Sequence, residues 1–228
     1  MAKQGTSPPA AVVMNMYYTG LGIARSLGAR GIPVVGLSAH RRIYGNFTRH
    51  ARFVACPDSR DDQDGLLKFL LRFANELNGR AVIFPTRDHD LVFLDRFRER
   101  LEPYYALAIA ERSVLHACLD KWETYRQAHD AGVPAPKCWM ITGAGDLERV
   151  LGDLTFPCVL KPLAAHHWRK AGNWELVGAR KACPISSAEE LRAEYAAVAR
   201  ADRRALVQQL IPGGDDSLVI AALSLIHI

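Results

Sequence analysis

Two lysines, Lys121 and Lys161, are the residues whose type and placement most suggest chemistry. Lys161 ends the apolar run "FPCVL" and is followed by Pro162, so the sequence predicts a strand that carries an ammonium group at its tip. Lys121 follows Asp120 near a predicted helix start. An ammonium group binds phosphate oxygens as a compact point charge. Each lysine taken alone is equally compatible with an ordinary solvent-exposed position.

A glycine-containing turn, "TGLGIARSLG" at 19–28, follows the first predicted strand. Gly20 and Gly22 allow a ligand close to the backbone, and a helix N-terminus favours anions. The complete dinucleotide fingerprint would need glycine in place of Arg25 and an acidic residue after the second strand, where residues 38–42 are basic. A Rossmann-type dinucleotide-binding oxidoreductase therefore remains the alternative function, and a tight strand-to-helix turn the simpler explanation.

A third feature is the stretch "VQQLIPGGDD" at 207–216. A purine needs hydrogen-bonding partners on its edge and apolar groups against its faces, and polar strand residues followed by an apolar pair could supply both. A carboxylate after the turn could bind ribose hydroxyls. An ordinary strand and turn would have the same composition.

These residues must be positioned by a chain that alternates strands and helices. We predict strands at 11–18, 32–39, 52–58, 81–86 and 105–110, separated by helices at 20–31, 61–79 and 88–101. Continuous apolar strands that alternate with helices predict a parallel sheet covered on both faces. Ligands of such sheets bind beyond the carboxyl ends of the strands.

The pattern changes after residue 111. We predict one or two helices at 114–132 and an irregular loop at 163–174. The other elements predicted here are strands at 137–142, 158–161, 175–182, 205–211 and 217–223 and helices at 146–154 and 186–201. This order predicts a small α+β module that covers a site.

Taken in this order, the features resemble the ATP-grasp superfamily of carboxylate-amine ligases over nearly the whole chain. "DKWETYRQAHDAGVPAPKCW" is similar to the family's helix with the first ATP lysine, "FPCVLKP" to the strand with the second, and "VQQLIPGGDDSL" to the hinge. The resemblance implies an N-terminal Rossmann-like parallel sheet, the pre-ATP-grasp domain, at 1–112. A partial ATP-grasp domain of linking helices and an α+β lid subdomain would span 113–222, with a non-native tail at 223–228.

Carried over residue by residue, the resemblance implies a nucleotide site. Lys121 and Lys161 would bind the phosphates of ATP, and Lys181 would complete their cover. The hinge residues that would bind adenine are Gln208, Gln209, Leu210 and Ile211, and Asp215 or Asp216 would approach the ribose. The family usually has a glutamate in the hinge where this chain has two glutamines, but an amide oxygen can still accept from the adenine amino group.

The chemistry that the resemblance implies is acyl activation. ATP phosphorylates a small-molecule carboxylate, and an amine or similar nucleophile then displaces phosphate, while lysines and Mg²⁺ stabilise charge and a lid excludes water. No catalytic residue is assigned. No metal ligand is assigned either, and His166 and His167 are not expected to bind metal.

The family's Mg²⁺ ligands lie beyond the hinge, and this chain ends shortly after it. The last residues, "LSLIHI", resemble a translated sequencing adapter. We therefore expect the authentic sequence in this chain to stop near Ala222 and the chain to be a C-terminally truncated form of the full-length protein. On this hypothesis the fragment binds ATP poorly and is inactive alone.

Composition narrows the classes of partner. The chain has 228 residues, a net charge of +5 and no apolar run of membrane-spanning length. Its five cysteines form no C-x-x-C pair, which argues against zinc or disulfide frameworks and fits a reducing cytoplasm. The basic stretch "HRRIYGNFTRHAR" at 40–52 leaves nucleic acid as an alternative partner, but no recognition motif accompanies it. We therefore expect neither a nucleic-acid nor a membrane partner, and the oligomeric state stays open.

Overall fold

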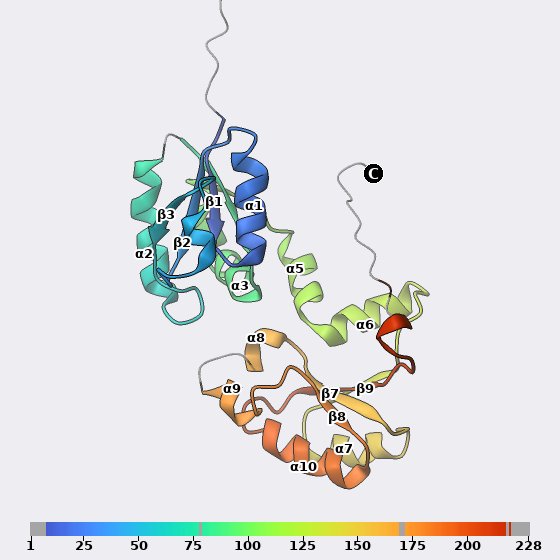
Figure 1. Ribbon diagram of the computed structural model, residues 1–228. Coiled ribbons are helices and arrows are strands. Elements are labelled where there is room, and N and C mark those ends of the chain that lie inside the picture. Colours follow the sequence, from blue (N-terminus) through green and yellow to red (C-terminus); the bar gives the residue numbers. More distant parts are fainter. Residues whose placement is uncertain (1–7, 78, 169–171, 218, 220–228) are drawn as a thin grey trace, which may run out of the picture. The chain divides into compact units, whose positions relative to one another are not determined.

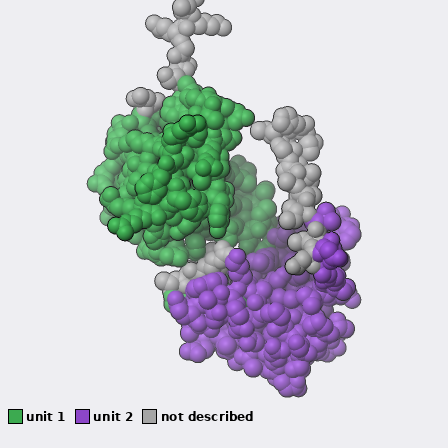
Figure 2. Space-filling model, viewed as in Figure 1, with its two compact units in different colours: residues 1–120, 164–173 green, residues 121–163, 174–228 purple. Residues whose placement is uncertain are grey.

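The computed structural model describes residues 8–77, 79–168, 172–217 and 219 (Figure 1). The chain divides into two compact units (Figure 2). Unit 1 contains residues 1–120 and 164–173, and unit 2 contains residues 121–163 and 174–228. The predicted tail at 223–228 lies outside the described residues.

Unit 1 is built on a five-stranded sheet in which every neighbouring pair is parallel. Its strand order is β3-β2-β1-β4-β5, so the first strand in sequence lies at the centre. The strands are β1 (Ala11–Met14), β2 (Val34–Ser38), β3 (Arg52–Ala55), β4 (Ala81–Phe84) and β5 (Tyr105–Leu107). The predicted parallel sheet is confirmed.

Helices cover both faces of this sheet, as the strand composition predicts. Val12 and Met14 of β1 belong to a core cluster with Leu70 and Phe93, while Ala11 and Val13 belong to a second cluster with Ala24. Successive strand residues point to opposite faces, so a strand buried on both sides is apolar throughout. The helices of unit 1 include α1 (Tyr18–Gly28), α2 (Gln63–Phe73), α3 (Asp88–Arg96), α4 (Arg98–Leu101) and α5 (Arg112–Leu119), with 3₁₀ turns at Tyr44–Phe47 and Ala74–Glu76.

The two glycines at the start of α1 have different surroundings. A Cβ on Gly20 would overlap the main-chain oxygen of Asn15, whereas a Cβ on Gly22 would meet nothing within 4 Å. Gly20 therefore lets the helix begin directly against the end of β1. Gly22 has no such steric role.

We predict that Gly20→Ala lowers the free energy of unfolding of unit 1 by about 1–3 kcal/mol, the usual cost of forcing extra volume into a packed site. Gly22→Ala is the matched control, and it should leave stability unchanged or raise it by about 0.5–1 kcal/mol because alanine favours helix. Urea unfolding of the two variants beside the parent checks both signs. Equal effects of the two substitutions would contradict the close approach at Gly20.

Unit 2 is built on a four-stranded sheet in which every neighbouring pair is antiparallel, in the order β6-β9-β7-β8. The strands are β6 (Cys138–Ile141), β7 (Cys158–Pro162), β8 (Cys183–Ile185) and β9 (Ala205–Gln209). Ile141, Leu160 and Val207 are buried on one face of this sheet. Helix α7 (Ala144–Leu151) contacts β6, and helix α10 (Ala188–Val198) contacts β8 (Figure 1). Helix α6 (Lys121–Asp130) also contacts β6. The expected α+β module is thus present.

Two predicted elements of the second half are wrong. The strand predicted at 175–182 is the end of helix α9 (Asn173–Leu176) and a turn in which Gly178 and Ala179 have φ values of +62° and +55°. Left-handed residues interrupt the extended backbone, so pairing begins only with β8. The loop predicted at 163–174 contains helix α8 (Ala165–Trp168).

The strand predicted at 217–223 falls mostly outside the described residues. Within the part of the chain that is described, no helix combines the length and the apolar character that crossing a bilayer requires.

Candidate functional site

The lysine at the end of β7 lies on the sheet face opposite to the buried face described above. In the β7–β9 pairing Lys161 is opposite Leu206 and Val159 is opposite Gln208, so Lys161 and Gln208 are diagonal neighbours on one face. Lys161 Nζ donates a hydrogen bond to Gln208 Oε1 at 2.9 Å. The sheet register therefore brings together two of the residues predicted from the sequence.

A third side chain, Tyr125 of α6, completes this cluster. Its hydroxyl donates to the same Gln208 Oε1 at 2.9 Å. Tyr125 is one helical turn after Lys121, so both side chains lie on one face of α6. Sequence reasoning missed Tyr125, although its spacing from Lys121 was the available signal.

The ammonium group of Lys161 has no acidic partner among the described residues: its hydrogen bond goes to a neutral amide. Lys161 is half-buried, and burial lowers its pKa below the usual value of 10.5. A cation that is partly removed from water and lacks a counter-ion gains free energy when an anion binds. The face of the second sheet that carries Lys161 therefore attracts a negative group.

The other predicted phosphate-binding lysine, Lys121, is the first residue of α6. Its main-chain N–H donates to the carbonyl oxygen of Leu163 at 2.9 Å. Leu163 is the residue next to the end of β7, so the backbone carrying Lys121 lies against the segment that follows Lys161. Lys181 is exposed in the turn before β8.

The predicted hinge continues from β9. Gln208 is 7% exposed, whereas Gln209 is exposed and its main-chain N–H donates to Lys137 O at 2.9 Å. Leu210 and Ile211 are 43% and 64% exposed, so apolar side chains follow the buried amide directly. The predicted ribose-binding residues Asp215 and Asp216 belong to the 3₁₀ turn Asp215–Ser217, in which Asp216 is exposed.

A groove of about 330 Å³ adjoins the cluster and shares Tyr125 with it. Aromatic rings of Trp122 and Trp139 line it, together with Arg126 and Lys137. Its volume lies at the lower end of the range for small-molecule sites. Unit 2 thus offers an aromatic groove beside a neutral amide and a cation that has no acidic partner among the described residues.

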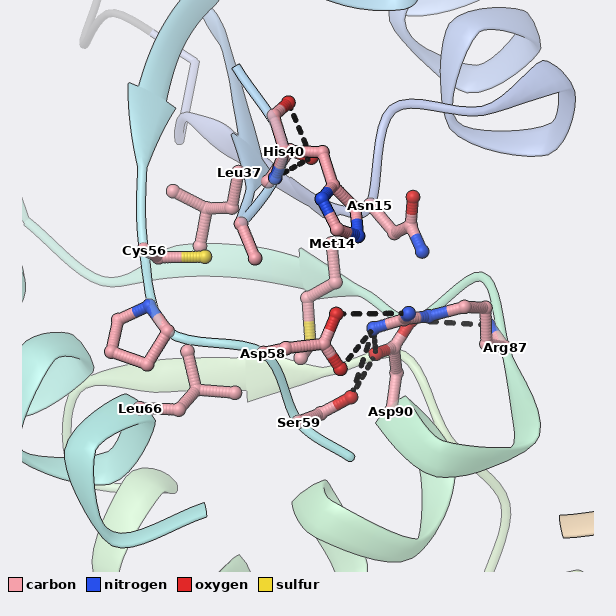
Figure 3. Close-up of a pocket in the computed structure, with 13 residues that line it drawn as sticks. Met14, Asn15, Leu37, His40, Cys56, Asp58, Ser59, Leu66, Arg87 and Asp90 are labelled. Atoms are coloured by element: carbon pink, nitrogen blue, oxygen red, sulfur yellow. Dashed lines mark hydrogen bonds and ion pairs between the residues drawn. The ribbon is translucent and has the colours of Figure 1, made fainter. Parts of the chain in front are cut away.

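A second polar cluster lies at the carboxyl ends of the strands in unit 1 (Figure 3). Arg87 Nη1 donates to Asp58 Oδ2 at 3.1 Å, and Arg87 Nη2 donates to Asp90 Oδ1 at 2.9 Å. Ser59 Oγ donates to Asp90 Oδ1 at 2.6 Å. Burial alone would lower the pKa of Arg87, but its hydrogen bonds to Asp90 and Asp58 raise it. Sequence reasoning missed this network because its members come from separate segments.

The pocket around this network has a volume of about 10 Å³, which is roughly the space for one water molecule. Its charged groups already bind one another, and burial raises the pKa of the neighbouring Cys56 thiol to about 12. Such a thiol is a poor nucleophile at neutral pH. We therefore assign the network a structural role and place the candidate site in unit 2.

The described residues hold no group of three or more His, Cys, Asp or Glu side chains suited to a metal ion. The described residues thus do not fit a Mg²⁺ ion held by protein side chains alone, which would need several carboxylate oxygens close together.

The chain is similar to one curated protein over part of its length and to solved structures over most of it. No family model matches the chain. A curated D-alanine–D-alanine ligase of Ectopseudomonas mendocina (strain ymp) is 29% identical over 102 residues, which is 45% of this chain and 29% of that protein.

Solved structures match over almost the whole chain. L-amino acid ligase from Bacillus licheniformis aligns with a TM-score of 0.64 and 16% identity, over 92% of this chain and 46% of that one. N5-carboxyaminoimidazole synthetase from Staphylococcus aureus, complexed with ADP, aligns with a TM-score of 0.63 and 13% identity, over 92% and 50% of the two chains. The biotin carboxylase domain of Hydrogenobacter thermophilus 2-oxoglutarate carboxylase, solved with MgADP and bicarbonate, aligns with a TM-score of 0.60 and 16% identity, over 89% and 44%.

The molecule is thus an α/β protein in which a five-stranded parallel Rossmann-like sheet is followed by a four-stranded antiparallel sheet. This is the fold of the first part of the ATP-grasp enzymes among the solved structures that the chain resembles. The chain spans about half the length of the solved relatives and less than a third of the curated ligase.

Proposed function

We propose that unit 2 binds the phosphates of ATP, as part of an enzyme that joins a small-molecule carboxylate to an amine or a similar nucleophile. The observation that carries this proposal is Lys161, a half-buried cation whose hydrogen-bond partner is a neutral amide. A phosphate oxygen would supply the missing negative charge. Three solved relatives contain ADP or MgADP, which supports a nucleotide as the anion.

The presence of the other predicted residues on the same unit supports the remaining parts of the proposed nucleotide site. Lys121 begins the helix that carries Tyr125, and its backbone lies against Leu163. We propose that Lys121 and Lys161 bind the phosphates and that Lys181 adds a third cation from its exposed turn. Gln208 and the apolar residues after it would bind the base, and Asp215 or Asp216 the ribose.

The reaction we propose has two steps. A carboxylate oxygen of the first substrate attacks the γ-phosphorus of ATP, so that ADP leaves and an acyl phosphate forms. The amine nitrogen of the second substrate then attacks the acyl carbon, inorganic phosphate leaves and the nitrogen loses a proton. The ammonium group of Lys161 would stabilise the negative charge that develops on the transferred phosphoryl group. Relatives named as ligases and synthetases act on small molecules, and a reducing cytoplasm would suit the five free cysteines.

Titration of the full chain separates this proposal from the alternatives. We expect saturable binding of ATP in the presence of Mg²⁺, with dissociation constants as weak as about 1 mM accessible to ligand-observed NMR. NAD tests the dinucleotide alternative, and a short DNA duplex tests the basic stretch at 40–52. No saturation by ATP, or tighter binding of NAD or DNA, would contradict the proposal.

A further inference from the structure

The amide of Gln208 has a fixed orientation in the cluster. A lysine ammonium group can only donate hydrogen bonds, so the atom that faces Lys161 Nζ at 2.9 Å must be the oxygen. The hydroxyl of Tyr125 donates to this oxygen as well. Both lone pairs of the oxygen are therefore occupied, and the amide nitrogen points elsewhere.

The amide nitrogen of Gln208 is weakly engaged. It donates to the main-chain oxygen of Gln209 at 3.5 Å, the outer limit of a hydrogen bond. An amide nitrogen has two N–H groups. Gln208, which is 7% exposed, thus keeps donor capacity at the start of the hinge.

This inference rests on the proposed function. When Lys161 moves to a phosphate oxygen, Gln208 Oε1 loses one donor and keeps Tyr125. The side chain then offers a base both an acceptor, its oxygen, and a donor, its nitrogen. The 6-amino group of adenine donates to the first, and the 6-oxo group of hypoxanthine or guanine accepts from the second.

We propose that Gln208, held in place by Tyr125, lets the nucleotide site accept 6-oxopurine and 6-aminopurine triphosphates with similar affinity. A glutamate at this position could not do so, because an ionised carboxylate only accepts hydrogen bonds and repels a carbonyl oxygen. Discrimination at the 6-position is strong where the wrong substituent leaves a buried polar group unpaired. The amide of Gln208 leaves neither the 6-amino nor the 6-oxo group unpaired, because it can accept from the first and donate to the second.

Parallel titrations with ATP and inosine triphosphate test the proposal, because the two bases differ only in the 6-substituent and the proton on the adjoining ring nitrogen. We expect dissociation constants within about tenfold of each other for the unmodified chain, a difference below ~1.4 kcal/mol. Gln208→Glu should shift the ratio by about tenfold or more toward ATP. The ratio is the readout because an ion pair between the new carboxylate and Lys161 would weaken both nucleotides alike.

Gln127→Glu is the matched control. It adds the same charge to unit 2 on an exposed side chain of α6, outside the proposed nucleotide site, and should leave the ratio unchanged. Tyr125→Phe removes one donor to Gln208 Oε1, so both nucleotides should bind several-fold more weakly.

Three outcomes would overturn the inference: preference of the unmodified chain for ATP beyond about tenfold, an unchanged ratio in Gln208→Glu, or an equally large shift of the ratio in Gln127→Glu. Unchanged affinities of both nucleotides in Tyr125→Phe would show that Tyr125 does not hold Gln208 in place. Failure of both nucleotides to bind would instead contradict the proposed function, so the two failures are distinguishable.

Discussion

Replacing Arg87 by methionine is expected to lower the free energy of unfolding of unit 1 by about 3–5 kcal/mol, the cost of removing one partner from a buried ion pair. Arg87 bridges two carboxylates, and its removal leaves both without their cation. The side chain of Asp90 is 0% exposed and that of Asp58 is 10% exposed, so water cannot replace the lost guanidinium group at Asp90. Hydrogen bonds from Ser59 and Thr86 remain, but they carry no charge.

Hydrogen exchange of the amides in β1 and β4, together with urea unfolding, measures this loss. Arg112→Met is the matched control because Arg112 also binds an aspartate, Asp95, but is itself 53% exposed. Exposed pairs contribute about 0–1 kcal/mol, so the control should be mild. Combining Arg87→Met with Asp90→Asn should cost less than the sum of the two single changes, because the double variant has no unpaired charge on Asp90. A loss below about 1 kcal/mol for Arg87→Met would exclude the structural role assigned here.

Replacing Lys161 by methionine is expected to weaken ATP binding by about 1–3 kcal/mol, the value of a charge-assisted hydrogen bond. Methionine keeps most of the buried stem and removes the charge. Lys68→Met removes the same charge from an exposed position on α2 of unit 1 and should change the affinity little. Equal ATP affinity in Lys161→Met and the parent would refute the role of Lys161.

The pH dependence of binding follows from the pKa of Lys161. Burial lowers this pKa below 10.5, and phosphate binds the protonated form. As the pH rises through the lowered pKa, the ammonium group loses its proton, so ATP affinity should fall at a lower pH than for an ordinary lysine. Bound phosphate raises the pKa, so binding in this range takes up protons. Titrations in Lys161→Arg, whose guanidinium group stays charged, should lack this alkaline decline.

Much of the architecture could be predicted from local patterns. The continuous apolar strands "AVVM" and "VVGLS" required burial on both faces and hence a parallel sheet with helices on each side. Lys161 at the end of an apolar run and Lys121 at a helix start could also be predicted, because each position depends on one local segment. The face on which Lys161 lies follows from the alternation of side chains along a single strand.

The remaining features depend on contacts between distant segments. Tyr125 and Gln208 are separated by 83 residues, and only the β7–β9 register and the packing of α6 bring them together. The unit 1 network joins Asp58 and Arg87 across 29 residues. The strand predicted at 175–182 failed for a local reason: Ala179 adopts a positive φ, which residue type alone does not indicate for alanine.

The central place of β1 in its sheet has a consequence for biosynthesis. β1 leaves the ribosome before the other strands of its sheet, pairs with β2 once residues 34–37 have emerged, and receives its second neighbour only with β4 at residues 82–84. Until then a wholly apolar strand has one unsatisfied edge, which is a template for association between nascent chains. Delays in translation between residues 40 and 80 should therefore reduce the yield of soluble product more than delays after residue 107, when all five strands are available.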